Sequence, residues 1–251
     1  MNLKGKVAMI TGGARGVGRG IADALTEAGV SVVLTARTGT DLDRAKGEIE
    51  AKGGKVHCIV GDVMKRTDNE RAVAAALEAF GRIDILVNNA GGTERAPFTD
   101  MSVERFQRLL QFNLLAPFEL TQLVVPHMLE VGGGSVVNIS SRSAQFGGTG
   151  FMAYSVSKAA LEQLTRTMAW ELAPKIRVNA ISIGIVETDA WRSTLSRIDE
   201  TARHTYLSKI PLQAVGSAKS VGLATLYLCS EESYVTGSVL PVDGGLRGAI
   251  V

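Results

Sequence analysis

Two residues with complementary acid–base chemistry, Tyr154 and Lys158, stand four positions apart in the sequence. Residues with this spacing share one face of a helix, so the phenol and the ammonium should be neighbours. A free tyrosine has a pKa of about 10 and is a poor base near neutral pH. A nearby ammonium favours the phenolate, and we therefore expect Lys158 to lower the pKa of Tyr154. Such a phenol can give a proton to a developing alkoxide or take one from an alcohol.

A hydroxyl that could hold the reacting oxygen lies at Ser141, just after a predicted strand. Its hydrogen bond would keep that oxygen beside Tyr154. Ser140 is the neighbouring alternative, but alternation along a strand points its side chain to the opposite face. Taken singly, Tyr154 and Lys158 are most simply an ordinary helix aromatic and a surface lysine. Together with Ser141 they predict a proton-transfer site.

A glycine-rich segment, Thr11-Gly12-Gly13-Ala14-Arg15-Gly16-Val17-Gly18, follows the first predicted strand and opens a helix. Glycines permit a tight turn and a close backbone approach to a pyrophosphate, and the helix N-terminus offers free N–H groups with a partial positive charge. Glycines alone also fit a plain turn, but here the strand precedes them and the helix follows, as a dinucleotide site requires. The predicted cofactor-binding residues of this loop are Gly12, Arg15, Gly16, Val17 and Gly18.

The end of the second predicted strand, Leu34-Thr35-Ala36-Arg37, indicates which dinucleotide binds. An NAD site usually carries an Asp or Glu there, bonded to the ribose 2′-hydroxyl. In this chain the acid is missing and a guanidinium is present. Arg15 and Arg37 can clamp a 2′-phosphate with charge-assisted bonds, whereas a carboxylate would repel it. The sequence therefore predicts NADP(H), the alternative being that Arg37 is a solvated surface residue.

Strand-like and helix-like segments alternate along the chain. Short β-branched runs predict strands at Val7–Thr11, Ser31–Thr35, Val56–Val60, Ile83–Val87, Ser135–Ile139, Arg177–Ile181 and Val239–Val242. Helical patterns lie between them at Gly16–Ala28, Leu42–Lys52, Asp68–Phe80, Val103–Leu129, Tyr154–Leu172 and Ala218–Cys229. Crossovers of this kind predict one α/β domain over residues 1–251, with a doubly wound, parallel, seven-stranded, Rossmann-like sheet. The long strandless stretch at about 187–216 is expected to form a substrate lid.

The chain resembles the short-chain dehydrogenase/reductase family, of the short single-domain type, essentially from end to end. The resemblance is carried by Thr11-Gly-x-x-x-Gly16-x-Gly18, Asp62-Val63, Asn88-Asn89-Ala90-Gly91, Asn113, Ser141, Tyr154-x-x-x-Lys158, Arg177-Val178-Asn179 and Asp243-Gly244-Gly245. The chain departs from the family at Ile183-Gly184, where Pro-Gly is usual. Because the glycine is retained we expect the same loop, without proline's contribution to its rigidity.

The resemblance implies further site residues. Asp62 and Val63 would bind the adenine end, and the segment Asn88-Asn89-Ala90-Gly91 would line the cofactor, with Asn89, Ala90 and Gly91 as binding residues. Gly184, Thr188 and the backbone of Val186 would hold the carboxamide end. Lys158 would bond the nicotinamide ribose, and Asn113 would anchor a water that connects Lys158 to solvent. The family also suggests a homotetramer, in which the helices beginning at Val103 and Tyr154 could meet.

These features predict a cytoplasmic oxidoreductase that moves a hydride between NADP(H) and a ketone or secondary alcohol. The segments Asn89-Ala90-Gly91-Gly92, Pro97-Phe98, Gly132-Gly133-Gly134 and Thr188-Asp189-Ala190 resemble bacterial hydroxysteroid dehydrogenases, which suggests a bulky, partly apolar substrate. Oxoacyl-carrier-protein reductases share most of these residues and remain an alternative. A dihydrodiol dehydrogenase fits less well, because that group more often uses NAD. A non-catalytic NADP(H) sensor would not need Ser141, Tyr154 and Lys158 together.

Composition excludes several other classes of protein. The 27 Lys+Arg and 25 Asp+Glu residues nearly balance, and no basic run indicates a nucleic acid or a membrane surface as partner. The two cysteines, Cys58 and Cys229, lie in apolar stretches and are expected to be buried free thiols. The sequence contains no apolar run of membrane-spanning length, and its start does not resemble a signal peptide. Metal binding is not expected, because no metal-ligand spacing links His57, His127 and His204.

Two tryptophans and a group of charged residues complete the expectations. Trp170, on the predicted catalytic helix, is expected in the core, and Trp191 could contact substrate or simply pack. The charges of the lid are expected to form a solvated face; these residues are Asp189, Arg192, Arg197, Asp199, Glu200, Arg203 and Lys209. The alternative is contact with an acidic substrate, to which Arg95 and Arg142 could contribute.

Overall fold

The computed structural model describes residues 3–188, 191, 200 and 207–246. Within these residues, one seven-stranded sheet consists of β1 (Val7–Thr11), β2 (Ser31–Ala36), β3 (Val56–Val60), β4 (Ile85–Asn88), β5 (Gly134–Ser141), β6 (Ile176–Ile183) and β7 (Val239–Val242). The strands lie in the order β3-β2-β1-β4-β5-β6-β7, and all adjacent pairs are parallel. The predicted doubly wound, Rossmann-like fold is confirmed.

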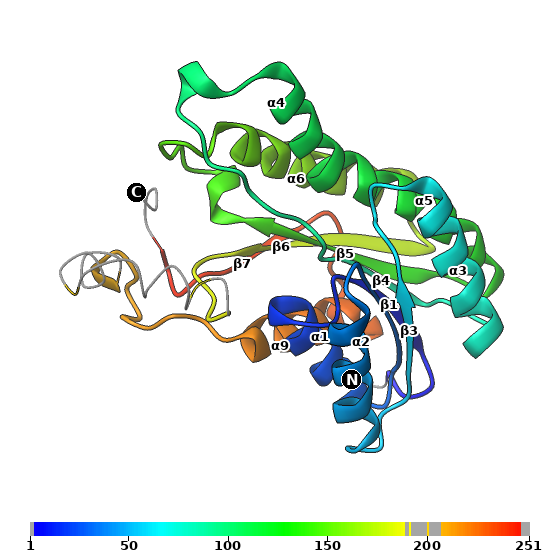
Figure 1. The fold of residues 1–251 in the computed structure, drawn as a ribbon. Helices are drawn as coiled ribbons and strands as arrows, with labels where there is room; N and C mark the ends of the chain where they lie inside the picture. Colours follow the sequence, from blue (N-terminus) through cyan, green and yellow to red (C-terminus); the bar gives the residue numbers. More distant parts are fainter. Residues whose placement is uncertain (1–2, 189–190, 192–199, 201–206, 247–251) are drawn as a thin grey trace.

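Helices cover both faces of this sheet (Figure 1). One face carries α1 (Gly16–Glu27), α2 (Gly39–Glu50) and α9 (Ala218–Cys229). The other carries α3 (Arg66–Phe80), α4 (Val103–Leu110), α5 (Ala116–Glu130) and α6 (Met152–Leu172). Each crossover therefore returns the chain to the end of the sheet where the strands begin, and the carboxyl ends of all strands lie together at the opposite end.

A hydrophobic core lies on each face of the sheet. All five residues of β1 are buried, because successive side chains of a strand point to opposite faces and both faces are covered. Ile10 packs with Ile21 and Leu25 of α1, whereas Met9 packs with Leu120 and Val124 of α5. The nearly continuous apolar character of the strand follows directly from its central position.

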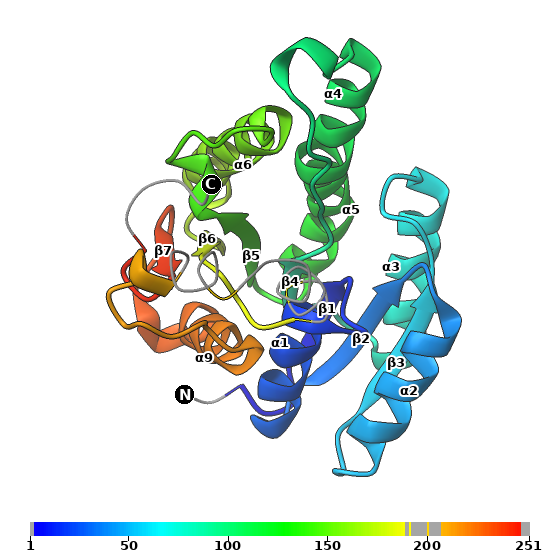
Figure 2. The same cartoon turned by 60° about the vertical axis from the view of Figure 1, so that its left-hand side comes forward.

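Small residues let α1 and α9 pack closely against each other, as Figure 2 shows beneath the sheet. A Cβ at Gly20 would lie 2.5 Å from the backbone carbon of Ala218, and one at Gly222 would lie 2.5 Å from the Gly20 carbonyl oxygen. Larger side chains at either position would separate the helices. This packing fixes the position of α1, whose first turn follows the glycine-rich loop.

The predicted single helix Val103–Leu129 is divided in the structure. A π-helical turn, Gln111–Leu115, separates α4 from α5. At its centre, the Asn113 side chain is fully buried and bonded to backbone groups, two of them on Gly92. Such turns occur mostly inside α-helices and often at functional sites. Apolar periodicity alone does not reveal it, because the hydrophobic pattern continues on both sides.

Trp170 is not in the core. Its side chain is 87% exposed near the end of α6, so that prediction was wrong. The helix pattern did not show that this turn of α6 faces outward. The expected lid falls largely outside the described residues, including Asp189, Arg192, Arg197, Asp199 and Arg203. No helix in the described parts of the chain is long and apolar enough to cross a membrane.

Candidate active site

The predicted site residues collect at the carboxyl edge of the sheet, around the ends of β1, β4, β5 and β6. The strand order reverses direction between β1 and β4, which is where such sheets bind ligands. Thr11, the last residue of β1, joins the two sides of this crevice. Its hydroxyl accepts hydrogen bonds from the backbone N–H groups of Asn89 at 3.0 Å and Ala90 at 2.9 Å. The Asn89 side chain donates back to the Thr11 carbonyl at 2.8 Å.

The glycine-rich loop forms a cradle that side chains would fill. Gly12 and Gly16 have φ values of +63° and +55°, a region that L side chains rarely adopt. A Cβ at Gly18 would lie 2.3 Å from the Gly12 carbonyl oxygen. The first turn of α1, which includes Val17, has no side-chain cap and no acidic residue, so its N–H groups suit an anion. These observations fit the pyrophosphate of a dinucleotide.

The residues predicted for the adenosine end lie at the neighbouring strand ends. Asp62 follows β3, and its carboxylate accepts the Met64 N–H at 3.0 Å. The Val63 carbonyl accepts a bond from Asn69. Arg37 follows β2 and is exposed.

The Arg15 side chain is 70% exposed and lies 3.9 Å from the carboxylate of Asp41, in the first turn of α2. Both predicted phosphate-binding arginines therefore present charge to solvent at the edge that carries the loop.

Asn88 does not line the cofactor crevice, and this part of the expectation was wrong. The Asn88 side chain is buried and donates to Thr121 at 3.1 Å and to Asn138 at 2.9 Å. Asn138 in turn donates to Thr165 at 2.8 Å. Side chains alternate along β4, so Asn88 joins the strands to α5 and α6, while the Asn89–Gly91 segment continues into the crevice.

The loop after β6 holds the residues predicted for the carboxamide end. The Gly184 N–H donates to the Val242 carbonyl at 3.1 Å, and a Cβ at Gly184 would lie 2.8 Å from the Cα of Asp243. Only glycine therefore fits this approach without a shift. Val186 is buried, and Thr188 lies beside Gly16 of the glycine-rich loop. The predicted loop is present although Ile183 replaces the usual proline.

The two adjacent serines at the end of β5 point in different directions. Ser140 is buried and donates to the Glu162 carboxylate of α6 at 2.8 Å. The Ser141 hydroxyl accepts the Ser143 N–H at 3.2 Å and interacts with the Tyr154 phenol. The geometry brings Ser141, not Ser140, to Tyr154.

The pKa of Tyr154 differs from the prediction. Burial of the phenol raises the pKa above its ordinary value, because a phenolate loses its hydration there. The hydrogen bond with Ser141 works in the opposite direction but is the smaller effect. Burial also lowers the pKa of Lys158 to about 8, so its ammonium gives up a proton more easily than that of an exposed lysine. The lysine Nζ lies 5.8 Å from the centre of the Tyr154 ring. Desolvation is therefore the largest effect on both pKa values, and it acts against the predicted lowering of the pKa of Tyr154.

Lys158 and Asn113 meet at Gly91. The Lys158 ammonium donates to the Ile139 carbonyl at 2.8 Å and is 4% exposed as a residue. A Cβ at Gly91 would lie 2.8 Å from the Asn113 side-chain oxygen and 3.2 Å from Lys158 Nζ. The structure thus brings together the two predicted polar residues from the π-helical turn and from α6. The water that would connect Lys158 to solvent stays a prediction.

One aromatic neighbour of Tyr154 was missed by the sequence reasoning. The rings of Phe151 and Tyr154 are 6.3 Å apart, and the Arg95 guanidinium lies 4.2 Å from the Phe151 ring centre. The Ala96 N–H also donates to the Gly150 carbonyl at 3.2 Å. These contacts join the loop after β4 to the segment before α6. No local motif signals them, because the partners are more than fifty residues apart.

Other candidate groups do not join the site. Among the described residues, no three His, Cys, Asp or Glu side chains are placed to hold a metal ion. His127 pairs with Glu130 at 3.3 Å, and His204 lies outside the described residues. Both cysteines are free; burial raises the pKa of Cys58 to about 11 and that of Cys229 to about 12.

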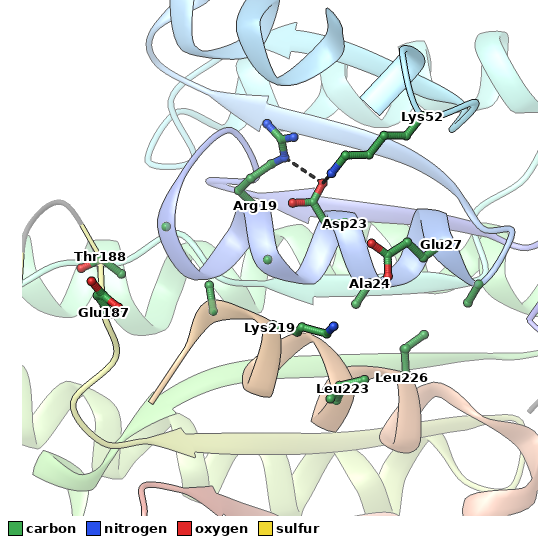
Figure 3. A pocket seen from close by; sticks show the side chains of 14 residues that line it. Arg19, Asp23, Ala24, Glu27, Lys52, Glu187, Thr188, Lys219, Leu223 and Leu226 are labelled. Carbon is green, nitrogen blue, oxygen red and sulfur yellow. Dashed lines mark hydrogen bonds and ion pairs between the residues drawn. The ribbon is translucent and has the colours of Figure 1, made fainter. Parts of the chain in front are cut away.

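A groove of about 570 Å³ lies between α1 and α9 (Figure 3). Gly16 and Thr188 line one end of it, so it adjoins the predicted cofactor site. Asp23, near its middle, lies close to Arg19 and Lys52. None of Ser141, Tyr154 and Lys158 lines the groove. It is therefore not the place where the predicted proton transfer would occur.

Comparison with known proteins agrees with this fold. A family model described as "Enoyl-(Acyl carrier protein) reductase" matches residues 12–247. A 3-oxoacyl-[acyl-carrier-protein] reductase of Thermotoga maritima is 40% identical, with 98% of this chain and 99% of that protein covered. A 7alpha-hydroxysteroid dehydrogenase of Escherichia coli is 36% identical, with 98% and 95% covered.

A solved structure extends the comparison. A 7α-hydroxysteroid dehydrogenase complexed with NADH and 7-oxo glycochenodeoxycholic acid superimposes with a TM-score of 0.93, at 36% identity, and 99% of this chain and 96% of that one are covered. The fold and the site define a nucleotide-binding oxidoreductase. The chain belongs to the short-chain dehydrogenase/reductase family.

Proposed function

We propose that this oxidoreductase reduces a ketone to a secondary alcohol, or catalyses the reverse oxidation, with NADP(H) as cofactor. The observation that carries the proposal is the meeting of the Ser141 hydroxyl, the Tyr154 phenol and the Lys158 ammonium, the last of which lies beside Gly91. A bound nicotinamide cofactor would supply or accept the hydride. The chain's own residues would hold the reacting oxygen and move the proton.

Each residue then has a role that follows from its surroundings. Ser141 holds the substrate oxygen by a hydrogen bond. Tyr154 donates its proton to that oxygen as negative charge develops, and its raised pKa keeps the proton available at neutral pH. Lys158 holds the ribose of the cofactor and favours the phenolate that remains. Asn113 keeps the loop at Gly92 in place through three hydrogen bonds, two of which reach Gly92 itself.

NADP(H) is favoured by the two exposed arginines at the adenosine end. Arg37 occupies the position after β2 where a carboxylate would bind a free ribose hydroxyl, and Arg15 projects from the glycine-rich loop. Two guanidinium groups bind a phosphate strongly. The similar hydroxysteroid dehydrogenase structure contains NADH, so the choice between the two cofactors needs a direct measurement.

For the substrate we propose a bulky, partly apolar ketone such as an oxosteroid. Phe151 supports this, because its ring lies 6.3 Å from that of Tyr154; the Arg95 guanidinium covers one of its faces. A 3-oxoacyl thioester is the second candidate, favoured by the 40% identity to the Thermotoga maritima reductase. Arg142 does not favour an acidic substrate, because its guanidinium already contacts Asp243, Gln145 and Leu246.

The deciding experiment follows the absorbance of NADPH and NADH with a panel of oxosteroids, 3-oxoacyl thioesters and small diketones, and of NADP⁺ with the matching alcohols. Turnover of one class with a higher kcat/KM for NADPH supports the proposal. Binding of NADPH without turnover of any class would instead favour a sensor. Oxidation of a cyclic dihydrodiol with NAD⁺ alone would favour a dihydrodiol dehydrogenase.

We further propose a cytoplasmic homotetramer. Exposed apolar side chains on α5 and α6 support assembly, among them Phe118 at 38%, Leu129 at 49% and Trp170 at 87%. Two free cysteines are consistent with a reducing compartment. Light scattering after size-exclusion chromatography tests the assembly; a monomer at micromolar concentration contradicts it.

A further inference from the structure

An ion pair next to Ser141 connects the ends of β5 and β7. The Nε of Arg142 lies 2.8 Å from a carboxylate oxygen of Asp243, and the two side chains are 15% and 9% exposed. The contact is ionic rather than a well-aligned hydrogen bond. The other Asp243 oxygen accepts the Gly245 N–H at 2.9 Å. Both charges are largely removed from water, so removing either partner leaves an uncompensated charge.

Three further contacts hold the Arg142 guanidinium in place. It donates to Gln145 at 2.5 Å and to the Leu246 carbonyl at 3.4 Å. Its flat face lies 4.7 Å from the centre of the Phe146 ring. A guanidinium with this many partners is fixed in orientation, and its groups are not free to bind substrate.

The strand register explains why this pair crosses the site. Ser141 is paired with Ile183, and Ile183 is paired with Val242. Arg142 and Asp243 directly follow β5 and β7, so their ion pair spans the end of β6. Gly184, the residue after β6, packs against the Cα of Asp243.

The same turn also anchors the C-terminal side of the predicted lid. The Leu212 N–H donates to the Gly244 carbonyl at 3.2 Å, and a Cβ at Gly244 would lie 2.7 Å from Ile210. Leu246 is buried with Ile185 and Ile210 in a small hydrophobic cluster. Arg142 therefore connects the segment that carries Ser141 to a well-packed support.

We infer that Arg142 is a positioning residue that, through Asp243, holds the Ser141 hydroxyl in register with the Tyr154 phenol. The inference rests on the proposed function, because it requires Ser141 to hold the substrate oxygen. Without the ion pair, the turn that begins at Arg142 loses its attachment to β7, and the serine hydroxyl moves relative to the phenol. The hydrogen bonds between Thr11, Asn89 and Ala90 in the cofactor cradle at β1 and β4 do not involve this pair, so we expect the cradle to keep its geometry.

The test measures kcat, KM and the Kd for NADPH in Arg142→Gln, Ser141→Ala and the double variant, with the best substrate of the panel. A displacement of about 1 Å can reduce a rate about 100-fold, so we expect Arg142→Gln to lower kcat about 10- to 100-fold. KM and Kd should change less than about threefold. In the Ser141→Ala background the same substitution should lower kcat less than about threefold, because the group that it positions is absent.

A matched control breaks a similar ion pair at the other edge of the sheet. Arg82 contacts Asp84 at 2.5 and 2.8 Å, and Asp84 is 3% exposed. Arg82→Gln should lower the Tm while leaving kcat unchanged; Lys6, 3.5 Å from Asp84, still pairs with the aspartate in this variant. If Arg142→Gln does not fold, Arg142→Lys takes its place. The lysine ammonium keeps the positive charge but cannot make the several simultaneous contacts of the planar guanidinium.

The outcomes separate the inference from the proposed function. The inference is overturned if the Arg142 variant keeps kcat within twofold, or if it lowers kcat equally with and without Ser141. If Ser141→Ala itself keeps kcat within tenfold, the proposed role of Ser141 fails, whatever Arg142 does. An equal fall of kcat in the Arg82 and Arg142 variants would show general destabilisation and also overturn the inference.

Discussion

The two halves of the candidate site are built in different ways. At β1 and β4 the surface of the site is made mostly of backbone. It consists of glycines with positive φ, the free N–H groups of α1, and the backbone N–H of Asn89, which is bonded to the Thr11 hydroxyl. At β5 to β7 it is made of side chains, among them the buried Lys158 and the Asp243 carboxylate, which is 9% exposed. Backbone geometry suits binding of a constant group, whereas buried side chains suit proton transfer, which depends on tuned pKa values.

This difference makes a distinction that mutations can test. Changes at Ser141 and Tyr154, in the side-chain half, should reduce the rate and leave cofactor binding intact. Changes in the backbone half should reduce cofactor binding before any effect on chemistry can be measured. A substitution in one half that changed the rate and cofactor binding equally would contradict this division of the site.

The largest effect is expected from Tyr154→Phe. The phenyl ring keeps the contact with Phe151 but has no proton to donate, so turnover should fall about 1,000-fold or more. The Kd for NADPH should stay within about threefold, measured by fluorescence titration. Residual activity within tenfold of the parent would falsify the proton-transfer role.

Gly18→Ala tests the backbone half. The added Cβ would lie 2.3 Å from the Gly12 carbonyl oxygen and 2.5 Å from the Asn89 side chain, so the loop must shift. We expect NADPH binding to weaken about 100-fold or more, measured by calorimetry, because the N–H groups no longer converge on the phosphates.

Gly47→Ala is the matched control, also a glycine in a helix. No atom lies within 4 Å of its added Cβ, and the substitution should stabilise α2 by about 0.5–1 kcal/mol. Undiminished NADPH affinity in the Gly18 variant would mean that the close approach is not needed for binding.

The elements of the backbone half could be predicted from the sequence because their signals are local. The glycine-rich loop and the β1 strand lie within twelve residues, and turn chemistry and apolar runs identify them. Ser141 could be chosen over Ser140 by strand alternation alone. The fold class followed from the alternation of strands and helices, which the sheet order confirms.

The side-chain half could be predicted only in part, because it depends on distant partners. The Arg142–Asp243 pair and the Arg95–Phe151 contact join residues about 100 and 56 positions apart, which no local pattern reveals. The raised pKa of Tyr154 depends on burial, which only the folded chain defines. Asn88 and Trp170 were misplaced for the same reason: the sequence does not show which neighbouring helix covers a side chain or leaves it exposed.

Arg37→Asp sharpens the comparison, since it changes a side chain at the rim of the backbone half. The carboxylate would repel a 2′-phosphate and accept a bond from a free 2′-hydroxyl. We expect the ratio of kcat/KM for NADPH to that for NADH to fall about 10- to 100-fold, with kcat nearly unchanged. Arg44→Asp is the control: Arg44 lies one turn into α2 and is paired with Asp41. An unchanged ratio in the Arg37 variant would contradict the NADP(H) assignment.

The smallest effect concerns the stability cost of Lys158. Burial lowers its pKa from 10.5 to about 8, so the folded protein binds this proton less tightly than the unfolded chain. The resulting destabilisation is complete below pH 8 and disappears as the pH rises toward 10.5, so this residue makes stability increase with pH across that window. One pKa unit corresponds to about 1.4 kcal/mol, and the change between pH 7 and 10 should be about 2 kcal/mol.

Lys158→Met should remove that dependence. Urea unfolding of the parent and the variant from pH 7 to pH 10 measures it, since titrating groups distant from residue 158 contribute equally to both proteins. The parent should gain stability relative to the variant as the pH rises. Parallel curves would mean that the ammonium is not desolvated in the folded protein. Burial of Lys158 would then not destabilise the folded protein, and the two halves of the site would differ in geometry alone.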